Sequence, residues 1–262
     1  MTNQFKLTRS QFDPFMLTAI GIFCQIWMVY WVVTHFTFQD LIPFFLVSWF
    51  VGMHITLFPH RAWSHRSWTP NKWVGIWGEF VFSIIMAGNV IGWVGVHREH
   101  HKFADTDKDP HSPLYKSRFA IQFLSYYNKV KHRYIVDVGR DPIHLWFYNN
   151  YWYVVAAWLI LMWACGLLGF WLACMGMCIM KLHGTNSVSH NTPWFFLPFK
   201  GKDKATNSLV LILLNINNGE AWHHNHHADG NDWRIGRKWY EIDPPAWVIM
   251  GLVKLNLATV KS

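Results

Sequence analysis

The chain has 262 residues, enough for one substantial domain and too few for several. Apolar residues make up 52% of it and charged residues only 15%, where soluble domains carry about 25% charged residues, so the composition indicates a membrane protein. The formal net charge of +8 does not indicate a nucleic-acid partner, because the basic residues stand beside apolar segments. They favour an anionic lipid surface or a ligand that carries phosphate.

Four apolar segments are long enough to cross a membrane. Residues 15–36 carry no charge, and a short link with Asp40 separates them from a second apolar segment. The 36 residues from Leu145 to Met180 are too many for one crossing, and the glycines near Gly166 offer a turn that divides them. The predicted spans are about 15–36, 41–59, 145–164 and 167–183, the last of which runs into the interface beyond residue 180.

The segment 73–96 is almost as apolar as a span, but it contains Glu79, Asn89 and five glycines. If it crossed, histidines before and after it would face opposite compartments. All 23 Lys and Arg lie outside the apolar parts of the spans, the fourth of which ends at Met180 just before Lys181, and four crossings would put every one of them on the same side. The two outer links, 37–40 and 165–169, contain none, which is the asymmetry that marks cytoplasmic segments. We therefore predict that 73–96 does not cross.

The expected fold is an all-α integral membrane protein, a single domain over residues 1–262. Four transmembrane helices carry a cytosolic helical cap with a histidine-rich site for two metal ions. Both termini and the site are expected on the cytoplasmic face, in a bacterial inner membrane rather than the endoplasmic reticulum.

Three histidine clusters stand at the predicted cytoplasmic ends of the spans. Residues at i, i+3 and i+4 share one face of a helix, so the spacing HxxHH aims three imidazoles at one point, as a metal centre requires. The spacing HxxxxH keeps no common face on a regular helix, so we expect the helix to change pitch there. The clusters are HRAWSH with His60 and His65, HREHH with His97, His100 and His101, and HHNHH with His223, His226 and His227.

A single histidine in a membrane protein is usually an interfacial or packing residue. We interpret six histidines in this way: His35, His54, His111, His132, His144 and His183. A repeated HxxHH beside membrane exits instead favours a metal site, and NSVSH adds Asn186 and His190 four residues apart. Eight or nine imidazoles exceed the three or four that one zinc ion takes, so two metal ions are predicted. Nitrogen ligands suit iron, copper and zinc alike.

Carboxylates near the clusters are candidates to accept the proton of the non-ligating ring nitrogen and so to fix each histidine's tautomer. Each of them could also be a solvated surface group. The candidates are Glu99, Asp105, Asp107, Asp109, Glu220 and Asp229.

The motifs HRAWSHRSW, HREHHKFADTDKDPH, NSVSH and GEAWHHNHH, in this order, resemble the membrane fatty-acid desaturase family, and more narrowly its stearoyl-CoA (Δ9) branch. The likeness runs from about His54 to the end of the chain. It implies four membrane helices, a cytosolic di-iron centre with nine histidine ligands, and an asparagine that holds a metal-bound water. His224 stands where the family usually has asparagine, and we interpret it as a non-ligand. The implied ligands are His60, His65, His97, His100, His101, His190, His223, His226 and His227, with Asn186 acting through water.

The resemblance also implies an activity: two Fe ions use O₂ to introduce a cis double bond, at Δ9, into a saturated acyl chain. The acyl chain could be carried on CoA, on a carrier protein or in a membrane lipid. Because no HPGG-like haem-binding stretch is present, we expect a separate electron donor, a ferredoxin or a b-type cytochrome with its reductase. Candidate headgroup contacts are Arg61, Arg66, Arg98 and Lys102. Candidate walls of a tunnel for the acyl tail are Trp63, Trp68, Trp73, Trp77 and Trp93.

Three alternatives remain open. A related membrane di-iron hydroxylase or monooxygenase would use similar clusters, although NSVSH and the short HxxxxH spacing favour the desaturase. An enzyme of the same fold could form a terminal alkene. A non-catalytic metal-binding or transport protein would place its ligands along a transmembrane path, whereas here they gather beyond the ends of the spans.

Overall fold

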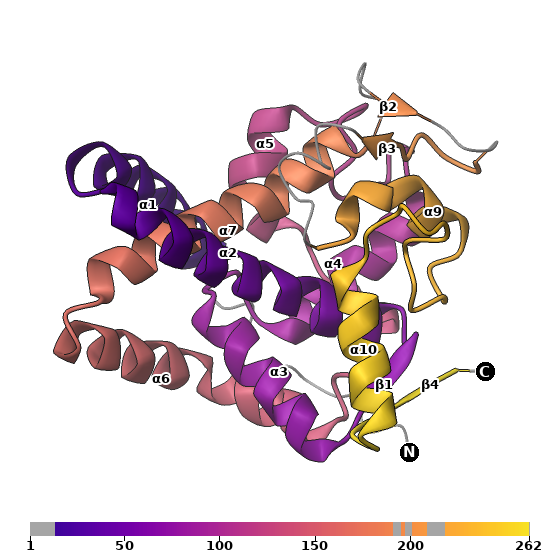
Figure 1. Cartoon of the computed structure of the whole chain (residues 1–262). Coiled ribbons are helices and arrows are strands. Elements are labelled where there is room, and N and C mark those ends of the chain that lie inside the picture. Colours follow the sequence, from indigo (N-terminus) through magenta and orange to yellow (C-terminus); the bar gives the residue numbers. More distant parts are fainter. Residues whose placement is uncertain (1–13, 191–194, 197–200, 209–217, 262) are drawn as a thin grey trace.

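The computed structural model describes residues 14–190, 195–196, 201–208 and 218–261, and the fold is mostly helical (Figure 1). The two chain ends, which we expect in the cytoplasm, lie outside these ranges. Four long helices correspond closely to the four predicted spans: α1 (Pro14–Thr34), α2 (Leu41–Ile55), α6 (Pro142–Ala164) and α7 (Leu168–Val188).

Within the part of the chain that the structure describes, two helices are long and apolar enough to cross a membrane: α1, and the continuous helical segment Phe38–Ser64 that contains α2. That segment begins with the 3₁₀ turn η1 (Phe38–Asp40) and ends with η2 (Thr56–Ser64). Helices α6 and α7 have 23 and 21 residues. At 1.5 Å per residue they are about 30–35 Å long, which matches the thickness of a hydrocarbon core.

Helices α1 and α7 pack closely because α7 presents small residues to α1. A Cβ atom at Gly176 would lie 2.1 Å from the Cys24 carbonyl oxygen, so only glycine allows this approach. At the N-terminal end of α7, the Trp27 indole N–H donates to the Gly169 carbonyl at 2.8 Å. Small residues and polar contacts of this kind replace the hydrophobic driving force between helices in lipid.

The apolar segment 73–96 is broken into two short helices, α3 (Lys72–Ile84) and α4 (Val90–Phe103). The chain between them takes left-handed backbone angles at Met86 and Gly88, with φ of 61° and 96°. Asn89 then caps α4 by accepting from the Gly92 N–H at 2.8 Å. Each helix is only about 20 Å long, too short to cross a hydrocarbon core.

The remaining elements are short and surround the end of the molecule where α2 and α7 finish. β1 pairs antiparallel with β4, with Trp68 opposite Val260, and β2 pairs antiparallel with β3, with Phe195 opposite Ser208. The elements are β1 (Trp68–Pro70), α5 (Arg118–Phe123), η3 (Ser125–Tyr127), η4 (His132–Tyr134), β2 (Phe195–Phe196), β3 (Asn207–Ser208), η5 (Glu220–Trp222), α9 (His223–Ala228), α10 (Pro244–Lys254) and β4 (Ala258–Val260).

The long helices place the histidine clusters at one end of the molecule. In Figure 1 the α1–α2 and α6–α7 turns lie on the left, whereas α4, α9 and β3 lie on the right. The C-terminal ends of α2 and α7 point toward this right-hand end. Segments far apart in sequence therefore meet there. The break in 73–96 places α4 at the same end of the molecule as the other histidine-bearing segments.

Replacement of Gly176 by alanine should separate α1 from α7 and lower the free energy of unfolding by about 1–3 kcal/mol, because the new Cβ collides with backbone. Gly251→Ala, in α10, is the matched control, because nothing lies within 4 Å of its added Cβ. Unfolding in detergent, followed by circular dichroism, measures both. Equal stability of the two variants would contradict the close helix contact.

Candidate metal centre

The first histidine cluster lies on a π-helical segment, η2, that continues α2. Its wide turn is closed by a hydrogen bond from the His65 N–H to the His60 carbonyl at 3.1 Å, five residues back. Pro59 has no N–H to donate, and the Ser64 hydroxyl donates to its carbonyl at 2.7 Å. The predicted change of pitch between His60 and His65 is therefore confirmed.

Five histidines form one group whose ring nitrogens all lie within 4.8 Å of one another. They come from three separate segments: the π-helical end of α2, helix α4 and helix α9. The Nε2 atoms of His60 and His226 are 2.9 Å apart, and those of His65 and His97 are 2.8 Å apart. The members of this five-histidine group are His60, His65, His97, His101 and His226.

Four further histidines form a second group by the same criterion. His190, just beyond α7, joins one histidine of α4 and two of α9. The Nε2 atoms of His190 and His223 are 3.2 Å apart. The two groups are neighbours, since the His101 and His227 rings stack with centroids 4.3 Å apart. The members of this four-histidine group are His100, His190, His223 and His227.

Our prediction that each HxxHH motif aims three rings at one point is wrong. In α4, His97 and His101 belong to the five-histidine group and His100 to the other. In α9, His223 and His227 belong to the four-histidine group, and the third histidine joins the five. Residues four apart lie about 40° apart around a helix, whereas the residue at i+3 points about 60° to the other side. Each motif therefore contributes to both groups.

Carboxylates accept hydrogen bonds from the outward-facing ring nitrogens of four of these histidines. Asp105, Asp109 and Glu220, all predicted from sequence, contact Nδ1 of His190 at 2.9 Å, His100 at 3.0 Å and His60 at 3.0 Å. Asp203 contacts His227 Nδ1 at 2.7 Å and was not predicted, because it belongs to no histidine motif.

The remaining predicted carboxylates do not contact a histidine of either group. Glu99 is buried but pairs with Lys131, so its predicted role is wrong: it lies on the face of α4 away from the rings. Asp107 and Asp229 are exposed.

Burial keeps seven of these imidazoles uncharged. It lowers the pKa of each of the seven well below the ordinary value, and repulsion from neighbouring imidazoles lowers it further. Burial alone would raise the pKa of Asp105, but hydrogen bonds from His190, the Lys204 N–H and Ser112 lower it instead. The seven histidines are His65, His97, His100, His101, His223, His226 and His227.

The donor set fits metal cations. His100 and His227 both give their Nδ1 proton to a carboxylate, so in each neutral ring Nε2 is a bare lone pair. These two Nε2 atoms face each other at 3.3 Å, a repulsive arrangement unless a positive charge lies beside both. The buried His223 Nδ1 has no hydrogen-bond partner among the described residues. Carboxylate-oriented imidazoles that converge on one point are the arrangement of a histidine metal site.

Two histidines outside the two groups differ in their contacts. His224 Nδ1 bonds the Ala205 carbonyl at 2.8 Å, so its ring points away from the centre. His111, which we interpreted as an unaccompanied packing residue, stacks on His100 with centroids 4.2 Å apart. With Asp109 it forms a third cluster around that ring. Its place two residues after Asp109 was the available sequence signal.

Most of the basic residues proposed from sequence as headgroup contacts form ion pairs with carboxylates of the protein itself. Arg61 is fully buried and bonds Asp243 at 2.7 Å, which makes a headgroup role wrong for it. Arg98 donates to Asp137 and to three backbone carbonyls, so its guanidinium is also occupied. Arg66 pairs with Asp137 at the surface, and Lys102 is exposed.

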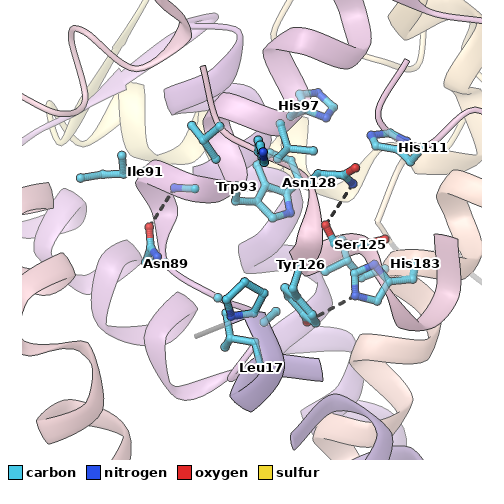
Figure 2. Close-up of a pocket in the computed structure, with 18 of the residues that line it drawn as sticks. Leu17, Asn89, Ile91, Trp93, His97, His111, Ser125, Tyr126, Asn128 and His183 are labelled. Carbon is cyan, nitrogen blue, oxygen red and sulfur yellow. Dashed lines mark hydrogen bonds between the residues drawn. The ribbon is translucent and has the colours of Figure 1, made fainter. Parts of the chain in front are cut away.

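Two cavities meet beside the histidine groups. The larger, about 390 Å³, has an apolar wall that includes Leu17 and Ile91 and a polar wall that includes His111 and His183 (Figure 2). The smaller, about 60 Å³, extends toward α2. Four residues line both cavities and so lie where the two meet: Trp93, His97, Leu182 and Asn186. Of the five tryptophans predicted to bound a tunnel, Trp93 alone lines these two cavities.

The family model for fatty acid desaturases matches residues 39–253, which include every histidine of both groups. The chain belongs to the fatty acid desaturase family.

Three relatives of this desaturase are similar over most of its length. An icosanoyl-CoA 5-desaturase of Limnanthes douglasii is 30% identical over 93% of the chain and 68% of its own length. Delta-9 acyl-lipid desaturase 1 of Arabidopsis thaliana is 30% identical over 86% and 76%. An sn-1 stearoyl-lipid 9-desaturase of Synechocystis is 32% identical over 79% and 66%.

Replacement of Asp105 by asparagine should weaken metal binding about 10–100-fold, because it removes the charged acceptor that orients His190. Competition with a chelator, followed by metal analysis, measures the affinity. Asp107→Asn makes the same change of charge at an exposed position and should bind as the wild type does. An unchanged affinity in Asp105→Asn would show that this carboxylate does not orient a ligand.

Proposed function

We propose that this chain is an O₂-dependent di-iron desaturase that introduces a cis double bond into a saturated acyl chain. The observation that carries the proposal is the inward-facing Nε2 lone pairs of His100 and His227, 3.3 Å apart and each fixed by a carboxylate behind its ring. Family membership supports the reaction type. Two groups of nitrogen ligands, adjacent to one another, support two metal ions.

The residues that would hold the metals follow from the two groups. The five-histidine group would hold one Fe ion, and the four-histidine group would hold the other with a water held by Asn186, which lines both cavities beside them. Bound iron supplies the activation of O₂ that side chains cannot provide. The protein supplies neutral ligands, carboxylates that fix their tautomers, and a buried setting that excludes bulk water.

The two cavities suggest how an acyl chain lies against the centre. We propose that the chain enters the larger cavity, passes Trp93 and Asn186, and ends in the smaller cavity toward Gly52 of α2. Lys129 is exposed and lines the larger cavity, so it is better placed than Arg61 or Arg98 to contact a phosphate-bearing carrier. The carbons beside Trp93 would then be those that lose hydrogen.

The carrier and the position of the double bond are proposed from the relatives. Two of those described above are named as 9-desaturases of lipid-bound acyl chains and one as a 5-desaturase of an acyl-CoA. We propose Δ9 as the position, with the acyl chain carried on a lipid or on CoA. These relatives differ in both the carrier and the position of the double bond. Both properties must therefore be determined by analysing the products of this chain.

We also propose that all four long helices cross the membrane and that the centre faces the cytoplasm. The histidines of η2, α4, α9 and the end of α7 meet at one place, so they share a compartment. Four crossings would put every Lys and Arg on that side, which the positive-inside rule assigns to the cytoplasm. The basic residues would then lie against the anionic leaflet.

Expression of the chain in a desaturase-deficient host, together with a ferredoxin and its reductase, should add monounsaturated acyl chains to the host's lipids. Gas chromatography with mass spectrometry of derivatised fatty acids gives the position and geometry of the bond, which we expect to be Δ9 and cis. His100→Ala should form none, and His224→Gln, outside both groups, should retain activity. Hydroxylated acyl chains would contradict desaturation and identify a hydroxylase.

A further inference from the structure

Residues 201–207, GKDKATN, run from the surface to the histidine centre, with Lys202 and Lys204 exposed and Ala205, Thr206 and Asn207 buried; we call this segment the strap. The Asp203 carboxylate contacts His227 Nδ1 at 2.7 Å. One residue later, the Lys204 N–H donates to Asp105 Oδ2 at 2.7 Å, and Asp105 in turn holds His190. The strap therefore contacts two members of the four-histidine group through carboxylates.

The rest of the strap anchors it to the same region. The Ala205 carbonyl lies 2.8 Å from His224 Nδ1, and the Asn207 side chain accepts from the His224 N–H at 2.9 Å. The Thr206 hydroxyl donates to the Ser189 carbonyl at 3.0 Å. These bonds fix the strap to the start of α9 and to the end of α7. Its position relative to the centre is thus set on both sides.

The outward face of the strap is basic. Lys202 and Lys204 are exposed, and neither forms an ion pair with any residue that the structure describes. Asp203, between them, turns inward to His227 and keeps only 13% of its side chain accessible. The one carboxylate of the strap therefore contacts a buried histidine, and the two lysines are exposed to solvent, where a partner protein can contact them.

The proposed reaction needs electrons from outside, a point that rests on the proposed function. Conversion of –CH₂–CH₂– to –CH=CH– releases two electrons and two protons, whereas reduction of O₂ to two waters consumes four of each. Two electrons and two protons must therefore be supplied for every double bond. Because the histidine rings are buried, a protein donor cannot contact them directly. It must dock on a surface from which a short path of bonds leads to one of the ligand histidines.

We propose that the strap is the docking surface for an acidic one-electron carrier protein, and that electrons enter through Asp203 and His227. Of the other three carboxylates that hold the rings, Asp105 and Asp109 keep only 5% and 0% of their side chains accessible, and Glu220 lines the smaller cavity. Asp203 is the one that stands in a surface segment between two exposed lysines. The net charge of +8 adds a long-range attraction for an acidic partner.

The test is the rate at which a reduced, acidic plant-type [2Fe–2S] ferredoxin is oxidised by the iron-loaded enzyme, measured by stopped-flow absorbance. Lys202→Glu with Lys204→Glu should lower the bimolecular rate constant about tenfold at low ionic strength, because reversed charges slow encounter. At about 0.5 M salt the difference should disappear through screening. The acidic soluble domain of a b-type cytochrome is run in parallel, and the effect is expected with whichever carrier reduces the wild type faster.

Lys254→Glu with Lys261→Glu is the matched control. It makes the same change of net charge at exposed positions on the end of α10 and after β4, away from β3 and the strap in Figure 1. Reduction by dithionite and the iron content should be the same in all variants. Equal slowing by the strap and control pairs would overturn the inference, and so would slowing by Lys102→Glu but not by the strap pair.

The same variants separate this inference from the proposed function. If dithionite-reduced wild type with O₂ forms no double bond, the proposed function fails whatever the lysines do. If it forms one, and the strap pair is reduced by the carrier at the wild-type rate at low ionic strength, the function stands and the docking surface is wrong.

Discussion

The constraint on which the rest of the structure depends is the packing of uncharged imidazoles with their lone pairs facing inward. His100 and His227 approach within 3.3 Å through nitrogens that cannot hydrogen-bond to each other once their other ring nitrogens have given a proton to carboxylates. Burial prevents these rings from taking a second proton. A bound cation would relieve the repulsion, so the arrangement of these rings is compatible with metal binding.

Several elements of the fold make this arrangement possible. The π-helical turn after α2 brings His60 and His65 to the same group, and the left-handed backbone at Met86 and Gly88 returns α4 to the same side. The close approach of α1 to α7 at Gly176 is one of the contacts that seat α7, beyond whose end His190 lies. The π-helical turn and the left-handed residues are energetically unfavourable backbone conformations, and both lie where they orient the histidine side chains.

Much of the fold and of the site followed from sequence, because apolar length and histidine spacing are local signals. The four long helices appear close to their predicted bounds, and the change of pitch between His60 and His65 was expected from spacing alone. The split of each HxxHH motif between two groups follows from helix geometry once a second target exists. Asp203 could not be predicted, since it reaches His227 only through tertiary contact, and neither could the burial of Arg61 against Asp243.

The central claim is that the two histidine groups hold two separate iron ions. The most direct measurement is anomalous X-ray diffraction from crystals of the iron-loaded protein, with data collected on both sides of the iron absorption edge. The account predicts two anomalous peaks, one within bonding distance of the five-histidine group and the other of the four. A single peak, or a peak beyond reach of either group, would contradict it.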